Sequence, residues 1–281
     1  MRNIIIYVAF SILSIQGFTQ THKSPIYAEV YGSGQPILFI PGFSIPGDVW
    51  KPTTEKLKSN YECHVLTLAG FGEHPPIDFP WLPDINTSIE SYIASQKLED
   101  VIVIGHSLGG TIAGWLASRG NHISRLILID ALPASGALMI PNYNPKNLVY
   151  ETPYNAKLLE MNEEDFNEVA STMAKGMSAS ANAQEQIKTW ILQADRKTYV
   201  YGYTDYLKLD VREDLKQINI PVTIIAATQP YGKEMASRTY GTQYKNLKSY
   251  DLIFADQAAH FVMLDKPEWF MSTIETLLQT P

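Results

Sequence analysis

The chain has 281 residues, with 22 Lys and Arg against 29 Asp and Glu, and 45% of its residues are hydrophobic. This composition fits one large globular domain and excludes wholesale disorder. The net charge of −7 provides no broad basic field for nucleic acid or anionic lipid, and the single cysteine excludes an intramolecular disulfide and any multi-cysteine metal site.

The first twenty residues have the pattern of a secretory signal peptide. Arg2 supplies a positive start, residues 4–15 are almost wholly apolar, and residues 17–20 close the segment with small and polar side chains. Twelve apolar residues are too few to span a bilayer, and no later apolar run is long enough. The alternative is an N-terminal core strand, since Ile and Val also favour β structure. We predict a signal peptide over residues 1–20, one domain over residues 21–281, and a secreted or periplasmic protein without a membrane span.

Short apolar runs alternate with helical patterns along the rest of the chain. Strands are predicted where β-branched runs are bounded by Gly, Pro or polar residues, at 36–40, 63–68, 101–104, 126–129, 222–227 and 250–254. Helices are predicted near residues 54–57, 88–96, 109–118, 234–244 and 267–278. Such alternation is typical of a mostly parallel sheet with helices on both faces, which is an α/β fold.

The alternation stops over residues 134–210. This stretch has helical patterns and a cluster of tyrosines at positions 199, 201, 203 and 206. A helical insertion after one strand of a parallel sheet would cover the carboxyl ends of the strands, where ligands of open α/β sheets bind. We therefore predict a helical lid over this stretch.

The strongest chemical signal is the segment Gly105-His106-Ser107-Leu108-Gly109. It follows a predicted strand and precedes a predicted helix, which is the context that a G-x-S-x-G nucleophile elbow requires. In such an elbow, a sharp turn holds the serine in a strained backbone conformation, and the glycines let neighbouring chain approach closely. A serine in an ordinary tight turn would not explain both glycines. Ser107 is therefore predicted to be a nucleophile.

A serine nucleophile needs a base, and histidine is the side chain that titrates near neutral pH. Of the six histidines, His260 follows the last predicted strand in a loop that leads into the final helix, at the same sheet edge as Ser107. His106 is the variable position of the elbow, and His74 lies in a Gly/Pro loop where it could touch substrate. We predict His260 to be the base.

An acyl-transfer mechanism also needs two backbone N–H groups for the oxyanion. Leu108, directly after the nucleophile, is expected to supply one. The loop after strand 36–40 is expected to supply the other, from Phe43, although Gly42 can also be read as an ordinary turn glycine.

These motifs resemble those of the α/β-hydrolase fold superfamily over nearly all of the predicted mature chain. The matching stretches are FIPGF at 39–43, LAGFG at 68–72, GHSLGG at 105–110 and HFVMLDKPE at 260–268. The resemblance implies a Ser–His–acid triad, no metal and no organic cofactor, and hydrolysis of esters, lactones, thioesters or small amides. A serine nucleophile argues against dehalogenation, which uses Asp in this fold.

The sequence departs from the family at three places. Pro41 precedes Gly42 where His-Gly is common, and Thr67 stands where many members have Asp, but neither change removes a backbone donor. The third departure affects the triad. Its acid usually follows the strand that corresponds to 222–227, and residues 228–232 contain no carboxylate.

Several carboxylates are candidates for the missing acid. Asp130 ends strand 126–129, and some α/β hydrolases carry their acid after that strand, but many members have an Asp there that only caps the following loop. Glu234 lies a few residues beyond the usual position of the acid. Its alternative interpretation is a solvent-exposed residue in the first turn of a helix. Asp256 is too close to His260 in sequence, and Asp205 is expected to be a surface charge. We predict Asp130, with Glu234 or no acid at all as the alternatives.

The expected reaction is acyl transfer through a Ser107 acyl-enzyme, with a small acyl substrate of apolar character. The predicted pocket lining is apolar, and the lid has no cluster of Arg and Lys for a polyanion; the lining residues are Phe43, Ile45, Trp81, Leu108, Leu132, Phe261 and the lid tyrosines. Two alternatives stay open. One is a proline-iminopeptidase-like peptidase, for which Glu163, Glu164 and Asp165 could bind an amine. The other is a slow receptor-like binder without an efficient triad. The oligomeric state is left open.

Overall fold

The computed structural model describes residues 23–120 and 122–279, and within them seven strands form one sheet. The strands are β1 (Ile26–Gly32), β2 (Gln35–Ile40), β3 (Tyr61–Leu68), β4 (Val101–His106), β5 (Ile123–Ile129), β6 (Val222–Ala227) and β7 (Asp251–Ala255). Their order is β1-β3-β2-β4-β5-β6-β7, with β1 antiparallel to β3 and the other pairs parallel. The predicted mostly parallel sheet is confirmed, whereas the predicted signal peptide lies outside the described residues.

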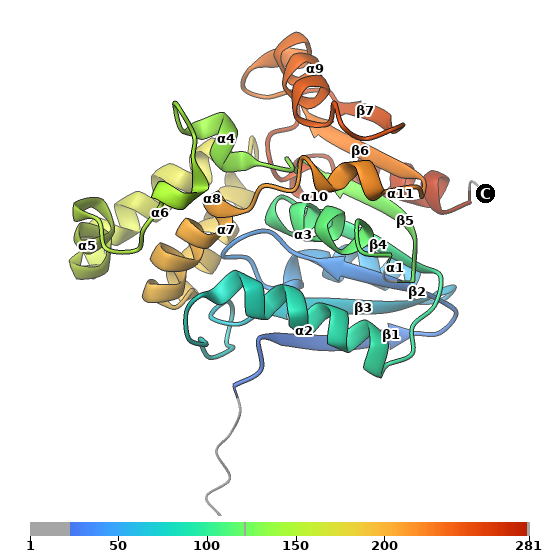
Figure 1. Ribbon diagram of the computed structural model, residues 1–281, viewed down its shortest axis with the longest axis horizontal. Helices are drawn as coiled ribbons and strands as arrows, with labels where there is room; N and C mark the ends of the chain where they lie inside the picture. The colour runs from blue at the N-terminus through green and yellow to red at the C-terminus, as the bar shows by residue number, and fades with distance from the viewer. Residues whose placement is uncertain (1–22, 121, 280–281) are drawn as a thin grey trace, which may run out of the picture.

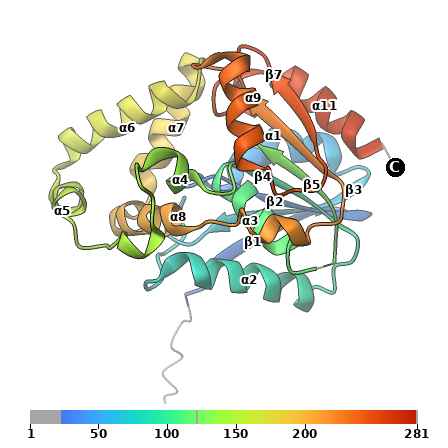
Figure 2. The ribbon, with the colours of Figure 1, turned by 45° about the horizontal axis from the view of Figure 1, so that its top comes forward.

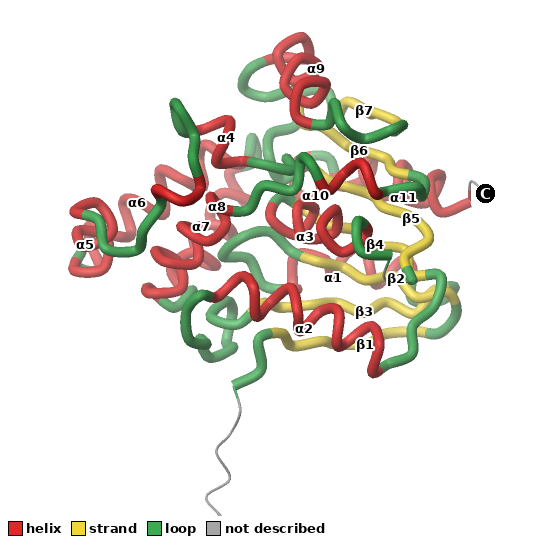
Figure 3. Tube along the Cα trace, viewed as in Figure 1, coloured by secondary structure: helices red, strands yellow, loops and turns green. Residues whose placement is uncertain are grey.

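Helices cover both faces of this sheet, which explains why the sequences of its strands are continuous apolar runs. Along β2, Ile37 and Phe39 belong to one core cluster, with residues from α1 (Lys51–Leu57) and α11 (Pro267–Gln279). Leu38 and Ile40 belong to the other cluster, with residues from α2 (Trp81–Ser95), α3 (Leu108–Ala117) and α9 (Gly232–Gln243). Figures 1 and 3 show the strands as a central layer with helices on either side.

A helical insertion lies between β5 and β6, where the alternation of strands and helices was expected to stop. Its elements are α4 (Ser135–Met139), η2 (Pro145–Asn147), α5 (Pro153–Glu160), α6 (Glu163–Met177), α7 (Ala181–Gln193), the π-helical turn η3 (Thr198–Gly202) and α8 (Tyr203–Lys208). Figure 2 shows these helices gathered beyond one end of the sheet. The insertion itself is as predicted, and its action as a lid stays a prediction. Among residues 23–120 and 122–279, no helix has both the length and the apolar character needed to cross a membrane.

Two features of the fold differ from the sequence prediction. Strand β1 was not predicted, because it is an edge strand with mostly half-buried or exposed side chains and a weak apolar pattern. Helix α2 begins at Trp81, earlier than expected, because the carboxylate of Asp205 accepts hydrogen bonds from the backbone N–H groups of Trp81 (2.7 Å) and Leu82 (3.3 Å). The prediction that Asp205 is a surface charge is therefore wrong, since its side chain is only 5% exposed.

Candidate active site

Ser107 lies at a strained turn between β4 and α3. Its backbone has φ 52° and ψ −121°, a combination that non-glycine residues rarely adopt, and its N–H donates to the carbonyl of Ile129 at 2.9 Å. Helix α3 begins at Leu108, so the N–H of Leu108 is among the first four of the helix, which have no carbonyl partner inside it. The segment therefore has the geometry expected of a nucleophile elbow.

The glycines of the elbow are needed because backbone approaches them closely. A Cβ added to Gly105 would lie 2.5 Å from the carbonyl oxygen of Gly109. A Cβ added to Gly109 would lie 2.2 Å from the carbonyl oxygen of Ile40 and 2.6 Å from that of Pro41. These contacts hold the elbow against the end of β2, from which the loop with Gly42 and Phe43 continues.

This packing predicts that Gly109→Ala destabilises the protein. The backbone atoms that meet the new methyl group cannot turn aside as a side chain would, so we expect a loss of about 3 kcal/mol in the free energy of unfolding measured with urea. Gly241→Ala in α9 is the matched control, since a Cβ there meets nothing within 4 Å. The control should gain about 0.5–1 kcal/mol from its better helix propensity. Equal unfolding midpoints for the Gly109→Ala variant and the wild type would contradict the proposed packing.

Asp130 and His260 meet at the carboxyl end of the sheet. Asp130 directly follows β5, with φ 42°, and His260 lies between β7 and α10 (Val262–Asp265). His260 Nδ1 is 2.6 Å from Asp130 Oδ2, and the Asp130 Oδ1 atom accepts from the Ala227 N–H at 2.9 Å and from the Tyr240 hydroxyl at 2.8 Å. Each carboxylate oxygen therefore has at least one donor, and the imidazole is held through its Nδ1 atom.

The environment of Asp130 favours the ionised carboxylate. Burial alone would raise the pKa of Asp130, but the hydrogen bonds from His260, Ala227 and Tyr240, together with the charge of His260, bring it below its ordinary value. Asp130 is therefore an anion that can stabilise a positive charge on the His260 ring.

The other candidates for the triad acid lie elsewhere. At the usual position after β6, Gln229 is exposed, and the Thr228 hydroxyl lies near the Ala255 carbonyl (3.4 Å) and accepts from the Gln257 N–H (2.9 Å). Glu234 is exposed in the first turn of α9, and Asp256 is also exposed. Of the carboxylates weighed from the sequence, Asp130 is the one that the structure brings to His260.

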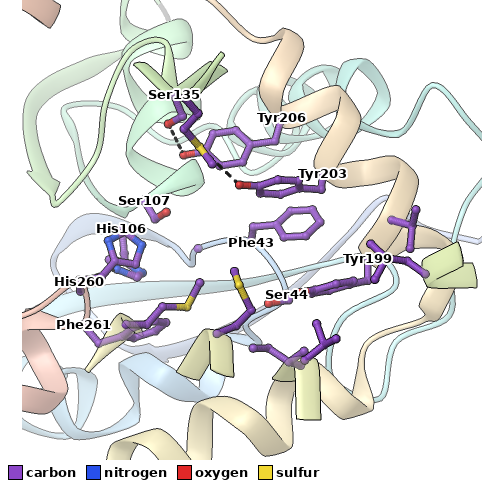
Figure 4. A pocket seen from close by; sticks show the side chains of 18 of the residues that line it. Phe43, Ser44, His106, Ser107, Ser135, Tyr199, Tyr203, Tyr206, His260 and Phe261 are labelled. Carbon is purple, nitrogen blue, oxygen red and sulfur yellow. Dashed lines mark hydrogen bonds between the residues drawn. The ribbon is translucent and has the colours of Figure 1, made fainter. Parts of the chain in front are cut away.

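Ser107 and His260 line one cavity of about 270 Å³, between the end of the sheet and the helical insertion. Figure 4 shows them at the same end of this cavity, with Phe43 and Tyr206 beside them. Among the hydrogen bonds of the described residues, none joins the Ser107 hydroxyl to His260. Such catalytic hydrogen bonds are often long in free enzymes and shorten in the substrate complex.

The candidate oxyanion loop also lies against the elbow. A Cβ added to Gly42 would be 3.3 Å from the Ser107 Cβ and 2.8 Å from His106 Nδ1, so only glycine allows the loop to come this close. Phe43, the next residue, lines the cavity. The structure thus brings the loop that carries the Phe43 N–H to the same place as the first turn of α3, which carries the Leu108 N–H.

His106, the variable residue of the elbow, is fully buried and lies in the cavity wall beside His260. Its Nε2 atom is 3.0 Å from the carbonyl oxygen of His260, and burial, aided by the nearby His260, lowers the pKa of His106 to about 3. His106 is therefore neutral and donates from Nε2 to the loop that carries His260. His74, weighed as a substrate contact, stacks on Tyr27 with ring centroids 3.6 Å apart and does not line the cavity.

The cavity wall is mostly apolar, but its residues differ from those predicted. Phe43, Phe261 and three of the four tyrosines line it; Ile45, Trp81, Leu108 and Leu132 do not, because their side chains pack in or against the core instead. The insertion supplies an apolar surface that the sequence did not indicate, made by Leu158, Val169, Met173, Met177, Ile191 and Val200. Among the described residues, no Asp, Glu, Lys or Arg side chain lines this cavity.

The acidic residues considered as a binding site for a substrate amine lie outside the cavity. Glu163, Glu164 and Asp165 form the first turn of α6, where Asn162 caps the helix and Glu163 pairs with Arg196 at 3.0 Å. None of the three lines the cavity that holds Ser107. Their arrangement is that of an ordinary helix start.

The chain belongs to the alpha/beta hydrolase family, whose sequence profile matches residues 37–273. Among its relatives is a pimeloyl-[acyl-carrier protein] methyl ester esterase of Aliivibrio fischeri, 25% identical over 267 residues, which cover 91% of this chain and 98% of the relative. A protein of the same name from Vibrio cholerae is 23% identical over 259 residues, covering 87% and 94% of the two chains.

Solved structures agree with this fold assignment. An esterase from Exiguobacterium antarcticum superimposes with a TM-score of 0.76 at 18% identity, covering 91% of this chain and 96% of the esterase. The enol-lactonase from Burkholderia xenovorans superimposes with a TM-score of 0.75 at 15% identity and the same coverage.

Proposed function

We propose that this protein is a serine hydrolase that cleaves small, uncharged carboxylic esters through a Ser107 acyl-enzyme. The observation that carries the proposal is the 2.6 Å contact between His260 Nδ1 and Asp130 Oδ2, at the end of the cavity where the elbow serine lies. This contact supports Asp130 as the triad acid, which the usual position after β6 lacks. The names of the sequence relatives, which are methyl ester esterases, also favour ester cleavage.

In the proposed acylation, His260 takes the Ser107 proton on Nε2 as Ser107 Oγ attacks the ester carbonyl. The carbonyl oxygen becomes an oxyanion that accepts from the N–H groups of Leu108 and Phe43. Collapse of the tetrahedral intermediate breaks the bond to the alcohol oxygen, and His260 returns the proton to this leaving group. Asp130 holds the ring and stabilises its positive charge throughout.

Deacylation repeats these steps with water. His260 takes a proton from water, the resulting hydroxide attacks the acyl carbonyl, and the proton passes to Ser107 Oγ as the acid leaves. The apolar cavity wall, with no charged lining among the described residues, suits an uncharged acyl group better than a polyanion.

The main argument for each alternative function, the peptidase and the receptor-like binder, is weakened by the positions of the acidic residues. A peptidase that binds a free amine would need an acid in the cavity, and Glu163, Glu164 and Asp165 lie elsewhere. The receptor-like binder was favoured by the missing triad acid, and the contact of the Asp130 carboxylate with His260 supports an acid at the end of β5 instead. Ester hydrolysis is therefore the function that the site supports best.

The proposal predicts steady hydrolysis of p-nitrophenyl butyrate and of n-butyl butyrate by the purified protein. An alkyl p-nitrophenyl phosphonate should stop both activities and leave one adduct, which peptide mapping by mass spectrometry should place on Ser107. Hydrolysis of aminoacyl anilides without hydrolysis of the esters would instead support the peptidase. Tight binding of the esters without turnover would support the binder.

A further inference from the structure

Two hydroxyl groups from distant parts of the chain meet in the cavity close to Ser107. Ser135 begins α4, just after the loop that follows β5, and Tyr206 lies in α8. Their oxygen atoms are 2.7 Å apart, and Figure 4 shows both near the Ser107 side chain. The two side chains are buried, at 8% and 7% exposure, yet both line the cavity.

This pair has one proton more than its internal hydrogen bond uses. Each hydroxyl has one proton, and only one of the two lies between the Ser135 and Tyr206 oxygens. The neighbouring Thr111 hydroxyl donates to the Leu132 carbonyl at 2.9 Å, so its own proton is engaged. Burial raises the pKa of Tyr206, against smaller lowering effects of hydrogen bonds with Ser135, Ser107 and Thr111, so its phenol stays protonated. The Ser107 and Thr111 oxygens lie within reach of the surplus proton in the free protein, and a substrate oxygen in the cavity can replace them as its acceptor.

The fold holds Tyr206 firmly in this position. The preceding residue, Asp205, fixes α8 to the start of α2 through the Trp81 N–H and accepts from the Tyr150 hydroxyl at 2.6 Å. The Tyr206 ring stacks on Phe43, with centroids 6.4 Å apart. A hydroxyl held in this way needs little ordering when it binds a ligand.

Other polar groups from the insertion are less suited to bind substrate. The Asn155 amide donates to the Tyr150 carbonyl at 2.8 Å and to the Thr204 hydroxyl at 3.2 Å. The Tyr203 hydroxyl lies 3.6 Å from the Met139 sulfur. The rest of the cavity wall that the helical insertion supplies is largely apolar. A hydrogen-bond donor beside Ser107 would therefore favour a substrate with an oxygen atom at that point over one with a methylene group.

We propose that Tyr206, paired with Ser135, is a specificity-determining residue that hydrogen-bonds a second oxygen of the substrate, two to four bonds from the scissile carbonyl carbon. The substrate class is then esters that carry an ether, keto or hydroxyl oxygen close to the ester bond, in the acyl or the alcohol part. This proposal rests on the proposed ester hydrolysis.

Two pairs of esters of matched shape test the proposal. In the acyl pair, p-nitrophenyl methoxyacetate differs from p-nitrophenyl butyrate by one oxygen in place of one methylene group. In the alcohol pair, 2-methoxyethyl butyrate differs from n-butyl butyrate in the same way. The measured quantity is the ratio of kcat/KM values within each pair. Comparing this ratio between wild type and variant cancels the intrinsic reactivity of the esters.

Tyr206→Phe should lower the ratio about tenfold in at least one pair, because the variant leaves the ether oxygen without its donor. The pair that responds tells whether the second oxygen lies in the acyl or the alcohol part. Tyr203→Phe is the matched control: it removes another tyrosine hydroxyl from the same helix and cavity, and its ratios should equal those of the wild type.

The proposal is overturned if Tyr206→Phe leaves both ratios at the wild-type value, or if Tyr203→Phe changes them equally. In either case butyrate turnover by the wild type would still support the proposed function. If the wild type hydrolyses none of the four esters, the proposed function fails and the inference fails with it.

Discussion

Ser107→Ala is expected to abolish steady ester hydrolysis, with a loss of roughly 10³- to 10⁶-fold in kcat, as is usual when the nucleophile of a serine triad is removed. The loss should be chemical and not structural. The N–H of residue 107 can still donate to the Ile129 carbonyl, and alanine fits the space of the serine side chain. The variant should therefore unfold with the wild-type midpoint in urea and fail to react with the phosphonate. Both are measured beside kcat on p-nitrophenyl butyrate.

Ser118→Ala is the matched control for this prediction. Ser118 lies at the far end of the same helix, and its hydroxyl donates to the Trp115 carbonyl at 2.7 Å. Its replacement should leave kcat and labelling unchanged. If Ser107→Ala keeps steady turnover and is still labelled by the phosphonate, another residue is the nucleophile.

The fold and the elbow could be predicted because their signals are local in sequence. Strands buried on both faces are continuous apolar runs, and the elbow needs its residue types within five positions, from Gly105 to Gly109. The structure explains both glycines by close backbone contacts. Asp130 was also within reach of the sequence, because an acid at the end of a parallel strand falls at the edge where Ser107 lies.

The features that sequence reasoning missed depend on pairs of residues that are distant in the chain. The local sequence predicts a surface charge for Asp205, but its carboxylate caps α2 at Trp81, 124 positions away in the chain. Ser135 and Tyr206 are separated by 71 positions, and neither belongs to a recognisable motif. The cavity wall likewise depends on how α5, α6 and α7 pack, and helical periodicity gives the buried face of a helix but not its partner. Export from the cell stays a prediction from residues 2–20.

Asp130→Asn is expected to lower kcat by about 10³- to 10⁴-fold. The reason lies in the donors around the side chain. Asp130 Oδ1 accepts from both Ala227 and Tyr240, so an asparagine at this position best keeps its carbonyl oxygen there. Its NH₂ group then faces His260 Nδ1. Because this group can only donate, Nδ1 must become the acceptor, and the proton moves to Nε2.

A His260 ring that is protonated at Nε2 cannot accept the Ser107 proton, so the variant should fold and bind esters but acylate slowly. kcat and KM are measured on p-nitrophenyl butyrate, with KM expected to change little. Glu234→Gln is the matched control, since this exposed residue was the alternative acid, and it should keep the wild-type kcat. Near-wild-type turnover in Asp130→Asn, together with a loss of orders of magnitude in Glu234→Gln, would mean that the triad acid is Glu234 in α9 and not Asp130. It would also mean that the carboxylate beside His260 only fixes the end of β5.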